Sequence, residues 1–220
     1  MIQIEKTADG SNTLYVPQLD EHYHSVKGAL TESEHIFINM GMRHCTLSCP
    51  HILEVGFGTG LNAFLTLMEA EKTRRHVRFT TIERYPVDEK ILEELSYPEQ
   101  ICPDRASDFY ALHRAAWNEE VQITPHFSLH KMLRDFTNIH LAGSFDVIYF
   151  DAFAPEKQPE MWNIALFRTL FDRLNPGGIL VTYCAKGAIR RTLQACGFIV
   201  ERLPGPPGGK REILRATKIR

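Results

Sequence analysis

Three glycines at alternate positions, Gly56, Gly58 and Gly60, follow a short apolar run and precede an apolar segment that suits a helix. This pattern predicts a buried strand, a tight turn and a helix. Glycines in such a turn can adopt positive φ and let a ligand approach without a Cβ in the way, while the helix start offers free N–H groups. The spacing is neither G-x-G-x-x-G nor G-x-x-x-x-G-K-S/T, so it predicts neither a dinucleotide fingerprint nor a P-loop.

The residues around these glycines extend the pattern to E-x-G-x-G-x-G. That pattern is typical of the loop that holds the amino-acid part of S-adenosylmethionine (AdoMet) in Rossmann-like methyltransferases. The alternative is a glycine turn that serves packing alone. The cofactor-binding residues predicted from this loop are Glu54, Gly56, Phe57, Gly58, Thr59, Gly60 and Asn62.

An acidic residue, Glu83, ends the next predicted strand about twenty residues after the glycines, where Rossmann-type sites place the partner of the ribose hydroxyls. A carboxylate suits this role because it can accept hydrogen bonds from two hydroxyl groups. The alternative is a surface glutamate at the start of the following helix. With the glycine loop upstream, we predict that Glu83 binds the cofactor ribose.

A second carboxylate, Asp151, follows the apolar run 145–150 and precedes Phe153 and Pro155. An acid, an aromatic residue and a proline at a strand end resemble the motif with which amine methyltransferases hold a nitrogen nucleophile. Methyl transfer from a sulfonium is an in-line displacement, so positioning the amine lone pair supplies most of the catalysis. A carboxylate can orient the amine and accept its proton, and an aromatic face suits the developing cation. We therefore predict Asp151 as the catalytic residue and as part of the cofactor site, with an N-cap or loop-bracing role as the alternative.

The composition fits one globular domain over residues 1–220, with 44% hydrophobic residues and a net charge of −2. No apolar stretch approaches the roughly 20 residues of a membrane span, and the five scattered cysteines favour reduced thiols, so we expect a cytoplasmic protein. The histidines and cysteines between His44 and His51 lack zinc-site spacing, and we predict no metal. The end of the chain is basic and could follow a phosphate backbone or form a solvated surface. Its basic residues are Arg202, Lys210, Arg211, Arg215, Lys218 and Arg220.

Apolar runs alternate with helix-like segments from position 51 onward. The alternation predicts an α/β fold with a mostly parallel, seven-stranded sheet covered on both faces, and an antiparallel edge pair at the end of the chain. Residues 1–50 form an N-terminal extension with a short β element at 14–16, before a Rossmann-like core over 51–220. Strands are predicted over 52–55, 77–82, 121–124, 145–150, 178–183, 197–203 and 212–217. Helices are predicted over 61–71, 88–95, 108–116, 129–136, 161–174 and 188–195.

Several blocks of the sequence resemble the methyltransferase half of the bifunctional enzymes that make 5-methylaminomethyl-2-thiouridine at the tRNA wobble position (MnmC-type). The blocks are Tyr23-His24-Ser25 with 28–33, Glu54–Asn62, Asp151–Trp162, 176–178, 188–193, 197–198 and 208–212. The resemblance implies a class I AdoMet-dependent methyltransferase that methylates the primary amine of 5-aminomethyl-(2-thio)uridine in the tRNA anticodon loop. The sequence contains no FAD-dependent oxidoreductase half, so the preceding step is expected either to be carried out by a separate oxidoreductase or to be unnecessary.

The same resemblance assigns further residues. It implies that Tyr23 belongs to the cofactor site. The family commonly has Gly-Asp after its third strand to contact adenine, and the nearest match here assigns that role to Ser128. The residues expected to meet the tRNA substrate are Phe153, Pro155, Lys157, Met161, Trp162, Lys210 and Arg211.

Alternatives stay open for the role of two substrate residues and for the function itself. Met161 and Trp162 stand at helical spacing with Phe167 and Leu170, which suits a core as well as a substrate pocket. The same fold also serves small-molecule amine methyltransferases and aminopropyl transferases. A non-catalytic RNA-binding module is less favoured, because a scaffold needs neither Glu83 nor Asp151.

Overall fold

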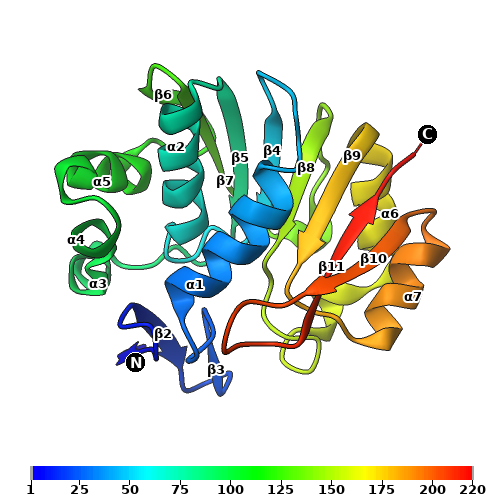
Figure 1. Ribbon diagram of the computed structural model, residues 1–220, viewed down its shortest axis with the longest axis horizontal. Coiled ribbons are helices and arrows are strands. Elements are labelled where there is room, and N and C mark those ends of the chain that lie inside the picture. The colour runs from blue at the N-terminus through cyan, green and yellow to red at the C-terminus, as the bar shows by residue number, and fades with distance from the viewer. Residues whose placement is uncertain (1, 220) are drawn as a thin grey trace.

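The computed structural model describes residues 2–219 and contains two β-sheets with helices around the larger one (Figure 1). The strands of the larger sheet are β4 (His51–Val55), β5 (Val77–Glu83), β6 (Glu120–Thr124), β7 (Phe127–Leu133), β8 (Phe145–Phe150), β9 (Leu174–Thr182), β10 (Ile199–Pro204) and β11 (Glu212–Thr217). They lie in the order β10-β11-β9-β8-β4-β5-β7-β6. The five central strands, from β9 to β7, are parallel, and β6, β11 and β10 are antiparallel to their neighbours. The mostly parallel sheet and the antiparallel C-terminal edge pair are confirmed.

The predicted helix over 129–136 is wrong, because this segment belongs to strand β7. Phe127, Leu129 and Lys131 are buried, whereas the residues between them are partly exposed. This period of two is the pattern of a strand, and a short run gives too few positions to separate it from a helical period. The extra strand makes the sheet eight-stranded instead of seven-stranded.

Helices cover both faces of the sheet. Successive side chains of β4 point to opposite faces, so Ile52 packs into the buried cluster on one face and Leu53 into the cluster on the other. The Ile52 cluster includes α2 and α5, and the Leu53 cluster includes α6 and α7. The α-helices are α1 (Ala29–Ser33), α2 (Leu61–Thr73), α3 (Glu89–Leu95), α4 (Tyr97–Ile101), α5 (Ala106–Arg114), α6 (Ile164–Arg173) and α7 (Gly187–Ala195). A π-helix over Glu34–Met42 continues α1, and short 3₁₀ turns cover Pro103–Arg105, Phe136–Asn138 and Pro159–Trp162.

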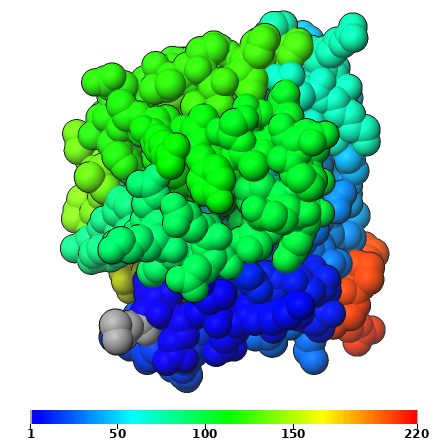
Figure 2. Space-filling model, turned by 90° about the vertical axis from the view of Figure 1, so that its left-hand side faces the viewer, coloured from blue at the N-terminus to red at the C-terminus, as the bar shows by residue number. Residues whose placement is uncertain are grey.

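The N-terminal extension forms its own small sheet from β1 (Gln3–Lys6), β2 (Asn12–Val16) and β3 (Glu21–His22). This sheet lies below the carboxyl ends of the parallel strands (Figure 1). It is tied to the helical layer because the Tyr97 hydroxyl donates to the Asn12 carbonyl at 2.8 Å. In Figure 2 the blue N-terminal part of the chain lies directly beneath the green part. The extension is therefore placed to close the end of the sheet at which ligands bind in such folds.

Neither a membrane-spanning helix nor a metal-binding cluster occurs within residues 2–219. No helix in this part of the chain has the length and apolar character needed to cross a bilayer. No group of three or more His, Cys, Asp or Glu side chains there is arranged to hold a metal ion.

Candidate active site

A cavity of about 1180 Å³ opens at the carboxyl ends of β4, β5 and β8. The predicted cofactor residues that line it are Tyr23, Gly56, Phe57, Gly58, Thr59, Asn62 and Glu83. The predicted reaction and substrate residues that line it are Asp151, Phe153, Pro155, Lys157, Met161, Lys210 and Arg211. We call the part around the glycine turn and Glu83 the cofactor half, and the part around Asp151 the amine half.

The glycine turn leaves no room for side chains. Gly56 has φ +95°, and a Cβ there would lie 3.0 Å from the Asp151 carbonyl oxygen. Gly58 has φ +51°, and a Cβ there would lie 2.9 Å from the Tyr23 ring. A larger residue at either position would be strained and would press on a cavity wall. Gly60 is the N-cap residue of helix α2 and is not among the residues that line the cavity.

Glu83 is held by backbone groups. Its Oε2 accepts the Gly58 N–H at 3.0 Å, and its Oε1 accepts the Tyr85 N–H at 2.7 Å. Burial raises the pKa of Glu83. Each oxygen keeps a lone pair for a hydroxyl donor from a ligand. Helix α3 is capped by Asp88, whose side chain accepts the Lys90 N–H, so Glu83 is not the cap of that helix.

Asp151 is joined to the glycine turn through Asn62. The Asn62 Nδ2 donates to Asp151 Oδ2 at 2.8 Å. Glu54 lies beneath the lining with no exposed surface and accepts the Thr81 hydroxyl at 2.7 Å. Burial raises the pKa of Glu54 well above its usual range and raises that of Asp151 to about 7. A carboxyl group with a pKa near neutrality suits general base catalysis.

Three consecutive residues of the N-terminal extension each contact a different part of the site. The Tyr23 ring contacts the Phe153 ring edge-on, with centroids 5.1 Å apart. The buried His24 forms a 2.8 Å hydrogen bond through Nε2 with the Thr59 hydroxyl in the glycine turn, and burial lowers the pKa of His24 to about 4. The Ser25 N–H donates to Glu32 at 2.9 Å. The extension thus spans both halves of the cavity.

Trp162 lies outside the cavity lining, in the core. Its ring packs against Phe150 and Phe167, and only 5% of the residue is exposed. Its Nε1 donates to the Phe153 carbonyl at 2.7 Å. The alternative of a core residue at helical spacing therefore describes Trp162, whereas the neighbouring Met161 lines the cavity.

Ser128 also lies away from the cavity lining, because it stands near the start of β7 instead of after a strand. Its hydroxyl donates to Glu120 at 3.1 Å. The lining at the opposite, carboxyl end of β7 includes Asp135. The predicted helix over 129–136 concealed the end of strand β7. If this strand had been predicted, Asp135 would have been recognised as an acidic residue close to a strand end.

A family model described as "S-adenosyl-L-methionine-dependent methyltransferase" matches residues 106–219, which is more than half of the chain. The chain belongs to this family. AdoMet is accordingly the cofactor of this methyltransferase, and the predicted class I AdoMet-dependent fold is confirmed.

Two relatives of this methyltransferase are named "tRNA 5-methylaminomethyl-2-thiouridine biosynthesis bifunctional protein MnmC". The protein from Cupriavidus metallidurans is 30% identical over 96% of the chain, and that from Magnetococcus marinus is 31% identical over 93%. The chain spans about a third of their length, 33% and 32% respectively. Among solved structures, the crystal structure of MnmC2 from Aquifex aeolicus superposes with a TM-score of 0.78 at 26% identity, covering 98% of this chain and 70% of that one.

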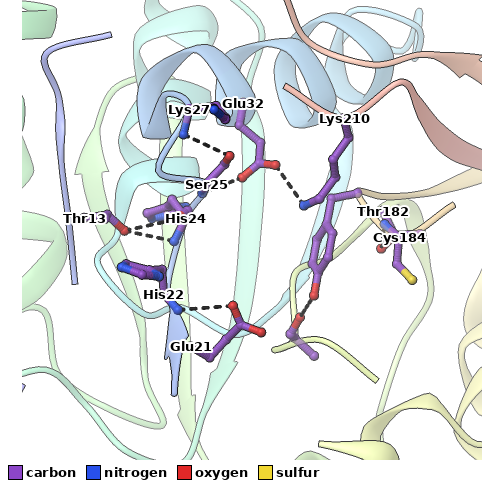
Figure 3. A network of polar contacts seen from close by, with 12 residues as sticks. Thr13, Glu21, His22, His24, Ser25, Lys27, Glu32, Thr182, Cys184 and Lys210 are labelled. Carbon is purple, nitrogen blue, oxygen red and sulfur yellow. Dashed lines mark hydrogen bonds and ion pairs between the residues drawn. The ribbon is translucent and has the colours of Figure 1, made fainter. Parts of the chain in front are cut away.

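The methyltransferase has a polar network in the amine half that the sequence did not indicate. Glu32 accepts the Ser25 N–H on one side and Lys210 Nζ, at 3.0 Å, on the other (Figure 3). Lys210 Nζ also lies 3.8 Å from the centroid of the Tyr183 ring, whose hydroxyl donates to the Ala152 carbonyl. Glu32 stands inside a block that resembles the family, but its partner Lys210 is 178 positions away.

The basic C-terminal residues are largely occupied by partners within the protein. Arg202 pairs with Glu212 at 3.6 Å and Arg215 pairs with Glu201 at 3.0 Å, while Lys218 donates to two carbonyls. Lys210 is bound to Glu32. Within residues 2–219, Arg190, Arg191 and Arg211 form no ion pair. We therefore expect any contact with a phosphate backbone to involve Arg190, Arg191 and Arg211 more than the C-terminal basic residues that already have partners.

Proposed function

We propose that this methyltransferase transfers the methyl group of AdoMet to the primary amine of 5-aminomethyl-(2-thio)uridine at the tRNA wobble position. The observation that carries the proposal is Asp151, a carboxyl group with a pKa of about 7 in the same cavity as the glycine turn and Glu83. The names of the bifunctional relatives supply the substrate. Because the chain spans a third of their length, both the substrate and the expected upstream oxidoreductase are proposals.

The residues of the cofactor half fit AdoMet. The open turn at Gly56 and Gly58 would receive its amino-acid part, and the free lone pairs of Glu83 would accept the ribose hydroxyls. Asp135, at the next strand end, takes the adenine-side position that the family resemblance assigned to Ser128. When bound, AdoMet supplies a methyl group on a positively charged sulfur, and an amine that attacks the methyl carbon in line displaces the sulfur.

The amine half would prepare the nucleophile. An alkylammonium must lose a proton before its nitrogen can attack, and Asp151 Oδ is the acceptor in this proposal. Asn62 fixes the orientation of the carboxyl group through its 2.8 Å hydrogen bond. The rings of Tyr23 and Phe153 provide an apolar, aromatic wall beside it.

The tRNA would meet the mouth of the cavity. A wobble base in a single-stranded anticodon loop can leave the stack at low cost and enter a pocket. Lys157, Pro155 and Met161 line the cavity on this side, and Arg211 adds a cation without an ion pair among residues 2–219. Phosphates near the mouth would then contact Arg190, Arg191 and Arg211.

The test is mass spectrometry of wobble nucleosides from tRNA incubated with the protein and isotope-labelled AdoMet. The tRNA is taken from cells that accumulate the 5-aminomethyl form, and small primary amines such as putrescine are assayed in parallel. We expect label in the wobble nucleoside of the tRNA only. Label in the small amines and none in tRNA would replace this proposal with the small-molecule alternative. A cytoplasmic location stays a prediction, which fractionation of cells can check.

A further inference from the structure

An ion pair between Glu32 and Lys210 lies within the amine half of the cavity. Both residues line the cavity that contains Asp151, and their charged atoms are 3.0 Å apart. The Glu32 side chain is 10% exposed, so it is held inside, while that of Lys210 is 43% exposed and reaches in from the turn between β10 and β11. A partly exposed pair contributes only about 0–1 kcal/mol to stability. Stability therefore does not account for a charge pair built from two ends of the chain beside the reacting group.

Asp151 interacts electrostatically with titratable groups from four other elements. These are Glu54 from β4, Glu32 from α1, Tyr183 from the end of β9 and Lys210 from the β10–β11 turn. Burial raises the pKa values of both Glu54 and Tyr183, which favours their uncharged forms. His24 in the N-terminal extension interacts electrostatically with Glu32 and Lys210. It is neutral at pH 7 because burial lowers its pKa to about 4. Among these groups, Glu32 and Lys210 are the two whose charges act on Asp151 at neutral pH.

The three charges match the needs of an amine that arrives protonated. With Asp151 ionised, the two carboxylates and one ammonium sum to one negative charge, which an incoming alkylammonium balances. After its proton passes to Asp151, the neutral amine and neutral carboxyl leave the Glu32–Lys210 pair balanced by itself. Lys210 favours the ionised form of Asp151, because a neighbouring cation lowers the pKa of a carboxyl group.

On the basis of the proposed function, we propose that Glu32 and Lys210 are positioning residues with opposite roles. Glu32 attracts the substrate as its ammonium form, and Lys210 keeps Asp151 ionised so that its carboxylate can accept the ammonium proton. In this step the N–H bond of the ammonium breaks and an O–H bond forms at Asp151 Oδ. The freed nitrogen lone pair then bonds the methyl carbon while the carbon–sulfur bond breaks and its electron pair stays on sulfur. No further reactant is needed.

The decisive measurement is a titration of Asp151 that needs neither AdoMet nor tRNA. Protein labelled with ¹³C at the aspartate carboxyl carbons is titrated by NMR between pH 4 and 9, and the Asp151 signal is assigned by its loss in Asp151→Asn. We expect a wild-type midpoint near the pKa of about 7. Lys210→Met should raise the midpoint and Glu32→Gln should lower it, each by on the order of one pH unit.

Two further variants separate charge from structure. Lys210→Arg keeps the positive charge and should restore the wild-type midpoint. Arg202→Met removes a similarly exposed cation from the same hairpin, where Arg202 pairs with Glu212, and should leave the midpoint unchanged. If Lys210→Met and Glu32→Gln shift the midpoint in the same direction, or not at all, the proposal is overturned.

The rate of methyl transfer to tRNA gives an independent readout. The acid limb of the kcat/KM profile should move to higher pH in Lys210→Met and to lower pH in Glu32→Gln, and Glu32→Gln should also raise KM. An absence of methyl transfer to tRNA by the wild type would remove the proposed function, whereas the NMR titration would still decide the roles of Glu32 and Lys210.

Discussion

The two halves of the cavity are built in different ways. The cofactor half comes mainly from one continuous stretch, Glu54–Asn62, completed by Glu83 at the end of the neighbouring strand. The amine half gathers Asp151, Glu32, Tyr183 and Lys210 from segments spread over most of the chain. The cofactor half is held by backbone N–H groups and tight glycine geometry, while the amine half is held by ionisable side chains. Steric changes should therefore damage the first, and changes of charge or pH should damage the second.

The largest effect is expected from Asp151→Asn, which keeps the shape of the side chain and removes the base. We expect kcat for methyl transfer to fall by about 10²- to 10⁴-fold, the usual contribution of a general base. Affinity for AdoMet, measured by calorimetry, should stay within a few-fold because the cofactor half is intact. Asp104→Asn, an exposed position in a short turn, is the matched control. A variant that keeps wild-type kcat would show that Asp151 only braces its loop.

Glu54 connects the two halves, and its protonation should be visible in the stability of the protein. Burial raises the pKa of Glu54 in the folded state, so between its unfolded and folded pKa values the folded protein binds more protons than the unfolded chain. The free energy of unfolding must then fall as pH rises above about 4.5, by at most about 1.4 kcal/mol per pH unit for this group. Asp151, whose pKa is raised to about 7, adds a slope of the same sign.

Glu54→Gln tests this linkage, because glutamine resembles the neutral carboxyl group and does not titrate. Urea unfolding between pH 5 and 8 should show a shallower loss of stability with rising pH than in the wild type. The Asp151 part of the slope should remain, and Asp151→Asn should remove it in turn. Equal slopes in the wild type and Glu54→Gln would mean that Glu54 is ionised in the folded protein.

Gly58→Ala should damage AdoMet binding in the cofactor half. The added Cβ would lie 2.9 Å from the Tyr23 ring at a positive φ, so the turn or the ring must move into the space that AdoMet needs. We expect at least about a tenfold loss of AdoMet affinity, equivalent to about 1.4 kcal/mol. Gly143→Ala is the control, because Gly143 also has a positive φ but a Cβ added there would meet no other atom within 4 Å. Both variants should lose stability, by about 1–2 kcal/mol, and only Gly58→Ala should lose affinity.

The same contrast explains what the sequence could predict. The glycine turn, Glu83 and Asp151 follow apolar runs, and local spacing identified their places at strand ends. Strand β7 was missed because its buried positions include Lys131, a residue that a hydrophobic pattern does not count. Because this segment was predicted as a helix, the adenine contact was assigned to Ser128, which lies outside the cavity lining, and Asp135, which lines the cavity beyond β7, was not considered. The pairing of Glu32 with Lys210 depends on how the N-terminal extension and the last hairpin pack together, which no local pattern contains.

The smallest effect is expected from Trp162→Phe, which tests whether a core residue shapes the amine half from behind. The change keeps an aromatic ring against Phe150 and Phe167 but leaves the Phe153 carbonyl without its donor. Loss of this hydrogen bond should cost about 1 kcal/mol of unfolding free energy. Because Phe153 lines the cavity and Trp162 does not, KM for tRNA should rise modestly while AdoMet affinity stays constant.

Met161→Ala removes a side chain from the lining itself and should raise KM with a smaller loss of stability. If Trp162→Phe changed KM with no loss of stability, Trp162 would have to contact the substrate directly, and the boundary of the amine half would extend to its ring.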